Sequence, residues 1–208
     1  MPENRAIVYV DGLNLYGGIC EVHRKDLLWI DLHKLIRWKI SRDDDLIAIK
    51  YFNTTPKSDQ DKIDRYLQWI DLLQNLSPKF EIIQGEFKKR PRRCKKCGQW
   101  YKDYEEKHTD VNIASHLLVD FFDDKFDIAY IISGDSDFVT ALRIIRDRSI
   151  DKAIVGIFPP ERYHDEIKKV CNRWEIIAIK ELERFVLPDE FTLNGKEYVK
   201  PPKWTKCE

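Results

Sequence analysis

Short apolar runs alternate with segments of helical periodicity along most of this 208-residue chain. Five apolar runs of strand length predict β-strands at residues 6–10, 46–52, 80–83, 128–132 and 152–158, with a shorter sixth strand at 175–179. Apolar residues that share one helix face predict helices at 32–40, around 63–73, at about 110–122, after Phe138 and at 161–170. Strands that alternate with helices predict an α/β fold in which a mainly parallel sheet is covered on both faces.

The C-terminal tail has a different pattern. Asn194-Gly195 separates two short segments of strand character, 191–193 and 197–199, which is a strong signal for a two-residue β-hairpin. Pro201-Pro202 then ends regular structure. The sequence therefore predicts one domain, residues 1–186, followed by a C-terminal hairpin extension and tail, residues 187–208.

Four aspartates lie at the ends of predicted strands or at the starts of predicted helices. Asp11 directly follows the first strand, and Asn14 adds an amide three residues later. Asp110 opens a helix in which positions 114, 117 and 121 are apolar, so we expect its carboxylate at the rim of the core. Asp135 and Asp137 occupy the turn between a buried strand and the next helix.

These acids converge if the second and third strands lie on one side of the first strand and the fourth strand lies on the other. The carboxyl ends of strands one and four are then neighbours at the switch point of the sheet, where ligands bind. Four carboxylates in one crevice suit a hard cation such as Mg²⁺ or Mn²⁺, which takes oxygen ligands. Such an ion can polarise a phosphodiester and activate a water.

Each acid also has a purely structural interpretation. Asp110 suits the positive end of a helix dipole, with Thr109 as the N-cap. Asp135 or Ser136 could cap the following helix, and Asp11-Gly12 could form an ordinary turn. Because all four acids occupy equivalent places in one α/β domain, the set favours a shared metal site over separate caps.

Three motifs carry a family resemblance. In order and spacing, Val10-Asp-Gly-Leu-Asn14, Glu106-Lys-His-Thr-Asp-Val111 and Ile132-Ser-Gly-Asp-Ser-Asp-Phe138 resemble the NYN domain of the PIN-like nuclease superfamily, in its LabA-like branch. The resemblance covers roughly residues 5–180 and says nothing about the C-terminal hairpin. It implies a PIN-like Rossmannoid three-layer sandwich with sheet order 3-2-1-4-5, and metal-dependent cleavage of RNA.

The resemblance also assigns roles within the motifs. It implies that Asp11, Asp110, Asp135 and Asp137 bind the metal, and that the Asn14 amide and the Ser133 hydroxyl lie beside them. These six residues are the candidate catalytic residues. All four acids are present, so no motif suggests an inactive enzyme.

Charge is balanced overall but uneven along the chain. The 36 basic and 36 acidic residues cancel, yet residues 88–96 carry seven cations in nine positions. With nearby aromatic residues, a basic loop at 88–104 suits RNA, with phosphates on the cations and bases on the rings. The candidate RNA contacts are Lys88, Lys89, Arg90, Arg92, Arg93, Lys95, Lys96, Trp100 and Lys107. From the loop alone, a solvated charged segment is an equal alternative.

Cys94 and Cys97 have the spacing of a zinc knuckle. A structural zinc needs four ligands, and the chain has no second CxxC pair. The remaining ligands could come, within one chain or across a homodimer, from His108, Cys20, Cys171 or Cys207. A reduced, metal-free pair is the alternative, and five cysteines do not suggest a disulfide framework.

The leading functional prediction is a Mg²⁺- or Mn²⁺-dependent ribonuclease that cuts within RNA. One alternative is a regulatory module that binds RNA with little or no turnover. A nucleotide-handling Rossmann-like enzyme is disfavoured because the first strand is followed by no Gly-x-Gly-x-x-Gly and there is no P-loop motif. No apolar run approaches the length of a membrane span and no signal-peptide core precedes Asp11, so we expect a cytoplasmic protein.

Overall fold

The computed structural model describes residues 4–57 and 59–204, apart from the side chains of 87–90 and 101–107. The strands are β1 (Asn4–Asp11), β2 (Asp44–Asn53), β3 (Phe80–Gln84), β4 (Glu86–Arg93), β5 (Trp100–Lys107), β6 (Ile128–Ile132), β7 (Ala153–Phe158), β8 (Arg173–Ile176), β9 (Glu190–Leu193) and β10 (Lys196–Val199). The α-helices are α1 (Gly12–Glu21), α2 (Leu32–Lys39), α3 (Gln60–Leu76), α4 (Thr109–Phe122), α5 (Val139–Arg148), α6 (Asp165–Val170) and α7 (Ile179–Arg184). Two 3₁₀ turns, η1 (Lys25–Leu28) and η2 (Pro202–Trp204), complete the set.

Six parallel strands form the central sheet, in the order β3-β2-β1-β6-β7-β8. Counted along the chain, these are the strands predicted as 3-2-1-4-5, with the sixth strand added at the β7 edge. The predicted α/β architecture and the switch point between β1 and β6 are therefore confirmed. The sixth strand starts at Arg173, earlier than predicted, because Asn172 exchanges hydrogen bonds of 2.8 Å with Ile154 of β7.

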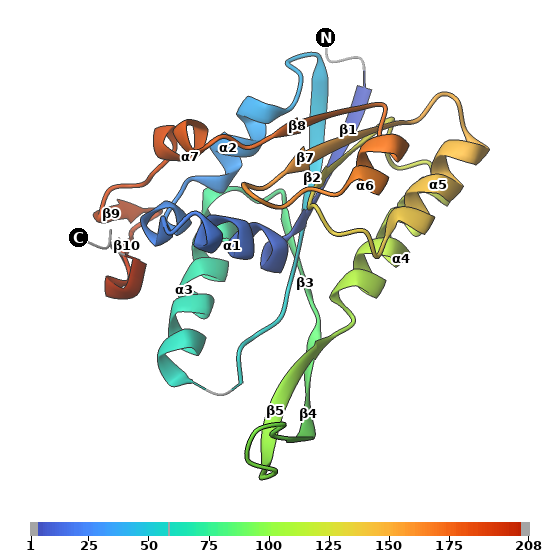
Figure 1. Ribbon diagram of the computed structural model, residues 1–208. Coiled ribbons are helices and arrows are strands. Elements are labelled where there is room, and N and C mark those ends of the chain that lie inside the picture. Colours follow the sequence, from blue (N-terminus) through green and yellow to red (C-terminus); the bar gives the residue numbers. More distant parts are fainter. Residues whose placement is uncertain (1–3, 58, 205–208) are drawn as a thin grey trace.

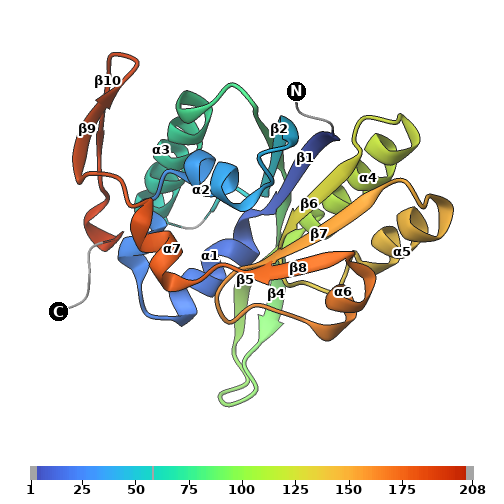
Figure 2. The same cartoon turned by 90° about the horizontal axis from the view of Figure 1, so that it is seen from above.

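The side chains of β1 explain why helices cover both faces of the sheet. Val8 and Val10 pack in one buried cluster with α1, α2 and α3, whereas Ile7 and Tyr9 pack in a second cluster with α4, α5 and α6. Successive side chains of a strand point to opposite faces, so a wholly apolar strand needs a covering layer on each side. Figure 2 shows the two helical layers on either side of the strands.

Helix α1 is the largest element that the apolar pattern of the sequence did not predict. Gly17 and Gly18 interrupt its apolar pattern, and glycine inside a helix is normally unfavourable. The tertiary structure requires the small residue at Gly18, because a Cβ there would lie 2.5 Å from the carbonyl oxygen of Pro160. Helix α6 also begins later than predicted, at Asp165, after the two prolines Pro159 and Pro160 and a turn.

The basic segment forms a β-hairpin and not the loop that was predicted. Strands β4 and β5 pair antiparallel from Glu86 opposite Lys107 to Arg93 opposite Trp100. Figures 1 and 2 show this hairpin projecting from the body of the molecule, and among the described strands no third one pairs with either edge of the ribbon. The side chains of Arg92, Arg93, Lys95 and Lys96 are exposed, so the backbone pairing of the ribbon places no described cation in an apolar environment.

The predicted C-terminal hairpin is confirmed as β9 and β10. Asn194 and Gly195 form its two-residue loop with φ of 51° and 79°, the left-handed values of a type I′ turn. The hairpin packs on the domain through Tyr198, which is 1% exposed. No helix within the described ranges is long and apolar enough to cross a membrane.

Candidate metal centre and its surroundings

Three of the predicted acids meet at one edge of the sheet. Asp11 ends β1, Asp110 lies in the first turn of α4 and Asp135 follows β6. Each offers a carboxylate oxygen, and these oxygens all lie within 4.8 Å of one another. The two strands that carry Asp11 and Asp135 are hydrogen-bonded neighbours, which explains why residues far apart in sequence converge here.

The structure does not bring Asp137 into this group. The Asp137 side chain is exposed, and its backbone N–H donates to the Oδ1 of Asp135 at 3.0 Å. This bond orients the carboxylate of Asp135, one of the three clustered acids, and Asp137 itself lies at the exposed mouth of the site.

The two predicted polar residues tie the end of β1 to the loop after β6. The Ser133 hydroxyl donates to the Oδ2 of Asp11 at 3.0 Å and accepts from the backbone N–H of Asp135 at 3.1 Å. The Oδ1 of Asn14 accepts from the backbone N–H of Gly134 at 3.0 Å. Ser133 and Asn14 therefore hold two of the carboxylates in a defined relation.

Burial makes the carboxylate of Asp11 unusual. The residue is only 4% exposed, and this desolvation raises the pKa of Asp11 to about 6. Hydrogen bonds from Asn14 and Ser133 lower the pKa, while the charge of Asp135 raises it further. An all-oxygen donor set with crowded negative charge fits a hard divalent cation, which would relieve the repulsion.

Gly134 fixes the loop that carries Asp135. A Cβ at this position would lie 2.2 Å from the carbonyl oxygen of Arg162, so only glycine allows the two loops to touch. Arg162 in turn donates through Nη2 to Glu21 at 2.6 Å. Arg162 was not predicted as part of the site because nothing in the local sequence links it to the acidic motif.

Asp110 does lie in the first turn of α4, as its helix-dipole interpretation expected, but the predicted caps Thr109 of α4 and Asp135 or Ser136 of α5 are wrong. The N-cap of α4 is His108, with φ of 79°, and the Thr109 hydroxyl lies 3.2 Å from that of Thr54 instead of capping the helix. The N-cap of α5 is Phe138, which makes no side-chain cap bond. Asp11 does cap α1, through a 3.0 Å bond from the N–H of Asn14, and it belongs to the acid group as well.

The described cations of the hairpin lie on its outer, solvent-exposed part. Among the predicted RNA contacts, those with exposed side chains are Arg92, Arg93, Lys95, Lys96 and Trp100. Trp100 is 69% exposed. The side chains of four further predicted RNA contacts lie outside the described residues: Lys88, Lys89, Arg90 and Lys107. Strand β5 leads directly into α4, so the hairpin is attached beside Asp110.

Cys94 and Cys97 lie in the turn at the tip of the hairpin. The N–H of Gly98 donates to the carbonyl of Cys94 at 2.9 Å, and Gly98 adopts a left-handed φ of 72°. Backbone N–H groups of Cys97 and Lys96 donate to the Cys94 sulfur and lower the pKa of its thiol. In the part of the chain that the structure describes, no third potential ligand joins the two cysteines. His108, Cys20 and Cys171 are thus not brought to them, and Cys207 lies outside that part.

Comparison with known proteins agrees with this architecture. A Vibrio parahaemolyticus protein of unknown function, VPA0982, has a similar fold, with a TM-score of 0.58 and 17% identity over 89% of this chain and 98% of that one. The 6-hydroxy-3-succinoylpyridine 3-monooxygenase HspA of Pseudomonas putida (strain DSM 28022 / S16) is 26% identical over 241 residues. That match covers 96% of this chain and 75% of HspA. The family model of the NYN domain matches residues 5–178, and the chain therefore belongs to the NYN domain family.

Proposed function

We propose that this chain is a divalent-metal-dependent ribonuclease that hydrolyses phosphodiester bonds within RNA. The observation that carries the proposal is the meeting of Asp11, Asp110 and Asp135, with oxygens within 4.8 Å of one another, in an NYN domain. These three carboxylates would hold Mg²⁺ or Mn²⁺. The ion would supply Lewis-acid activation of the phosphodiester and of the attacking water.

The chain's own residues position this chemistry. Ser133 orients Asp11, and Asn14 holds the loop that carries Asp135. We assign Asp137 as the fourth acid of the site, acting from the exposed mouth, where its N–H also fixes Asp135.

The basic hairpin would hold the RNA strand. Its exposed cations and the exposed ring of Trp100 combine phosphate neutralisation with base stacking, the pattern of a sequence-tolerant single-strand contact. We extend this role to Lys88, Lys89, Arg90 and Lys107 on the basis of sequence. The hairpin runs directly into the helix of Asp110, so a bound strand would pass the acids.

We also propose that the tip of the hairpin is half of a structural zinc site. The N–H bonds to the Cys94 sulfur favour a thiolate, and Cys97 adds a second sulfur ligand. A second copy of the hairpin, in a homodimer, would complete four sulfur ligands. Zinc content measured by elemental analysis should then be one ion per two chains, and Cys94→Ser should lose both the zinc and the dimer.

Two other functions use the same features. An RNA-binding module without turnover would keep the hairpin contacts and leave RNA intact. Oxygenation of a substituted pyridine, the activity in the name of HspA, is favoured by an apolar pocket with aromatic walls that adjoins the acids. An analysis of the reaction products distinguishes the RNA-binding module and the oxygenase from the ribonuclease.

The decisive experiment compares purified wild-type protein with Asp135→Asn on unstructured and structured RNAs, with Mn²⁺ or EDTA. We expect metal-dependent cleavage by the wild type and a loss of roughly 100-fold or more in the variant. Asp151→Asn, which changes an exposed aspartate outside the site, should cleave like the wild type. Equal cleavage by Asp135→Asn and wild type would refute the proposal, and retained RNA binding without cleavage would favour the binding module.

A further inference from the structure

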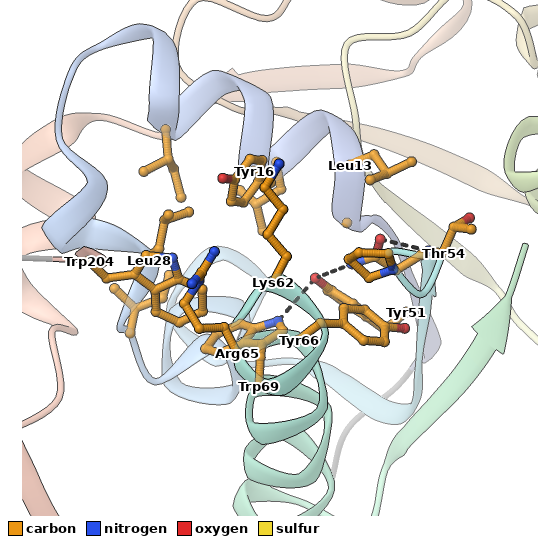
Figure 3. Close-up of a pocket in the computed structure, with 16 residues that line it drawn as sticks. Leu13, Tyr16, Leu28, Tyr51, Thr54, Lys62, Arg65, Tyr66, Trp69 and Trp204 are labelled. Carbon is orange, nitrogen blue, oxygen red and sulfur yellow. Dashed lines mark hydrogen bonds between the residues drawn. The ribbon is translucent and has the colours of Figure 1, made fainter. Parts of the chain in front are cut away.

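A pocket of about 250 Å³ lies between α1 and α3 (Figure 3). Its walls include the rings of Tyr66, Trp69 and Trp204, each only 8% exposed. Pockets for drug-sized ligands measure about 300–1,000 Å³, so this one fits a single ring system.

The wall of the pocket is shared with the metal centre. Gly12 lines the pocket and directly follows Asp11. Thr54 also lines it, and its hydroxyl lies 3.2 Å from that of Thr109, the residue before Asp110. Figure 3 shows Leu13 and Thr54 at one end of the pocket and Trp204 at the other. A molecule with a ring in the pocket would therefore lie beside the metal centre.

The rim combines an aromatic ring with two cations. Tyr16 of α1 is 48% exposed and faces Lys62 of α3 across the opening (Figure 3). Arg65 lies one turn further along α3. Within the described ranges Lys62 and Arg65 form no ion pair, and the neighbouring acid Asp61 is paired with Lys203 at 2.9 Å. The two cations are thus available to an anionic group on the ligand.

Tyr51 gives the pocket a polar contact at its inner end. Its hydroxyl oxygen accepts from the Nε1 of Trp69 at 3.1 Å and from the Nδ2 of Asn53 at 3.3 Å. Both bonds use the oxygen as acceptor, and no acceptor for the hydroxyl proton is found in the described part of the chain. Burial raises the pKa of Tyr51, so the group stays a donor that a carbonyl or ring nitrogen could satisfy.

We infer that this pocket binds the base of the RNA nucleotide next to the cleaved bond, with a phosphate of that nucleotide on Lys62 and Arg65. Stacking between aromatic side chains suits any base, and the Tyr51 proton adds one hydrogen bond to a base acceptor. The link to cleavage rests on the proposed ribonuclease function, whereas binding of the base does not.

Equilibrium binding in EDTA tests the pocket without catalysis. The probes are adenosine 5′-monophosphate, adenosine, ribose 5-phosphate and benzoate, and the readout is calorimetry with tryptophan fluorescence as a second signal. We expect the monophosphate to bind more tightly than adenosine or ribose 5-phosphate. Tyr16→Ala should weaken it about tenfold, the effect of losing one stacking ring. The double variant Lys62→Ala/Arg65→Ala should weaken the monophosphate several-fold, about the effect of surface charge pairs, and leave adenosine unchanged.

Matched controls come from elsewhere on the surface. Trp38→Ala removes a ring that is 49% exposed on α2, and Lys180→Ala removes an exposed cation on α7; both should bind the monophosphate like the wild type. Absence of monophosphate binding, or an unchanged affinity in Tyr16→Ala, would overturn the inference. Benzoate binding as tight as the monophosphate would also overturn it, since the pocket would then serve a free aromatic acid.

Cleavage kinetics separate this inference from the ribonuclease proposal. If RNA is cleaved and Tyr16→Ala raises KM, both stand. If RNA is cleaved with an unchanged KM in Tyr16→Ala and the monophosphate does not bind, only the pocket fails. If the monophosphate binds as expected and no RNA is cleaved, the ribonuclease fails and the base-binding pocket stands.

Discussion

Asp11 shows how one residue serves the fold and the site together. Its Oδ1 caps α1, its Oδ2 accepts from Ser133, and the side chain is almost fully buried beside Asp135. Local sequence predicted either a turn or a ligand, and the structure combines a cap with the acid cluster. In the metal-free protein the buried negative charge of Asp11 is destabilising.

Because this charge is buried, we predict that the effect of Asp11→Asn on the free energy of unfolding, measured in EDTA, depends on pH. The pKa of Asp11 is about 6 in the folded protein, above the ordinary value of 3.8, so the folded state holds the proton more tightly. Well below pH 3.8 the carboxyl is neutral in both states, and between about pH 4 and 6 the unfolded chain is ionised while the folded protein still holds the proton, so the wild type loses stability over this range. The unfolding free energy of the variant minus that of the wild type should therefore grow from pH 4 to 6, by on the order of 1–3 kcal/mol, and then level off.

Urea unfolding at a series of pH values measures this difference. Asp151→Asn should show no such trend, because that carboxylate is exposed. Mn²⁺ at pH 7.5 should stabilise the wild type and not Asp11→Asn. A difference that is flat between pH 4 and 7 would contradict the assignment.

At the scale of elements, the β4–β5 hairpin is the feature that distinguishes the surface of this domain. It projects from the body, and Lys95 and Lys96 lie beside the cysteines at its tip. The many cations of this segment predicted contact with RNA. They did not predict that the segment forms a hairpin, because the hairpin depends on backbone pairing between β4 and β5. The ribbon carries exposed cations on strand β4, at Arg92 and Arg93, and in its turn, at Lys95 and Lys96, so an extended strand could contact several of them.

If the β4–β5 hairpin contacts RNA phosphates, removing its lysines should reduce the salt dependence of RNA binding. With single-stranded RNA each lost phosphate contact lowers the slope of log K against log salt by about 0.7, so Lys95→Ala/Lys96→Ala should lower it by up to about 1.4. Anisotropy titrations in EDTA at several salt concentrations give the slope. Lys34→Ala/Lys180→Ala, which changes exposed lysines on α2 and α7, is the control and should keep the wild-type slope. The same slope in both double variants would remove the hairpin from the interface.

At the scale of the molecule, the C-terminal extension is part of the main core. The Nε1 of Trp29 donates to the carbonyl of Pro188 at 2.8 Å, and the rings of Trp29 and Trp204 lie 6.2 Å apart. Tyr198 belongs to the same buried cluster as Trp29. The β9–β10 hairpin was predicted as an extension because its turn is local, but the ring of Phe191 in this hairpin lies 6.0 Å from that of Trp29, a residue more than 150 positions away.

Deleting residues 188–208 should therefore destabilise the whole domain. The truncation exposes Trp29 and leaves its Nε1 without its acceptor, so we expect a loss of about 3–5 kcal/mol in the unfolding free energy. Tyr198→Phe removes only the hydroxyl bonded to Asp71 at 2.5 Å and should cost about 1 kcal/mol. Urea denaturation compares the two. The truncated protein should also bind adenosine 5′-monophosphate poorly, because Trp204 lines the pocket. An unchanged unfolding midpoint would show that residues 4–187 fold independently.

The sequence alone determined the features that depend on a few neighbouring residues. Apolar periodicity placed the central strands and most helices, Asn194-Gly195 specified the type I′ turn, and the motifs singled out the acids. Tertiary structure decided which of these acids meet, since the bonds from Ser133 to Asp11 and from Gly134 to Asn14 join residues 122 and 120 positions apart. It also decided the start of α1, the hairpin form of the basic segment and the pocket between α1 and α3. Local patterns report the conformation of a segment, whereas a site of converging side chains exists only after distant segments pack together.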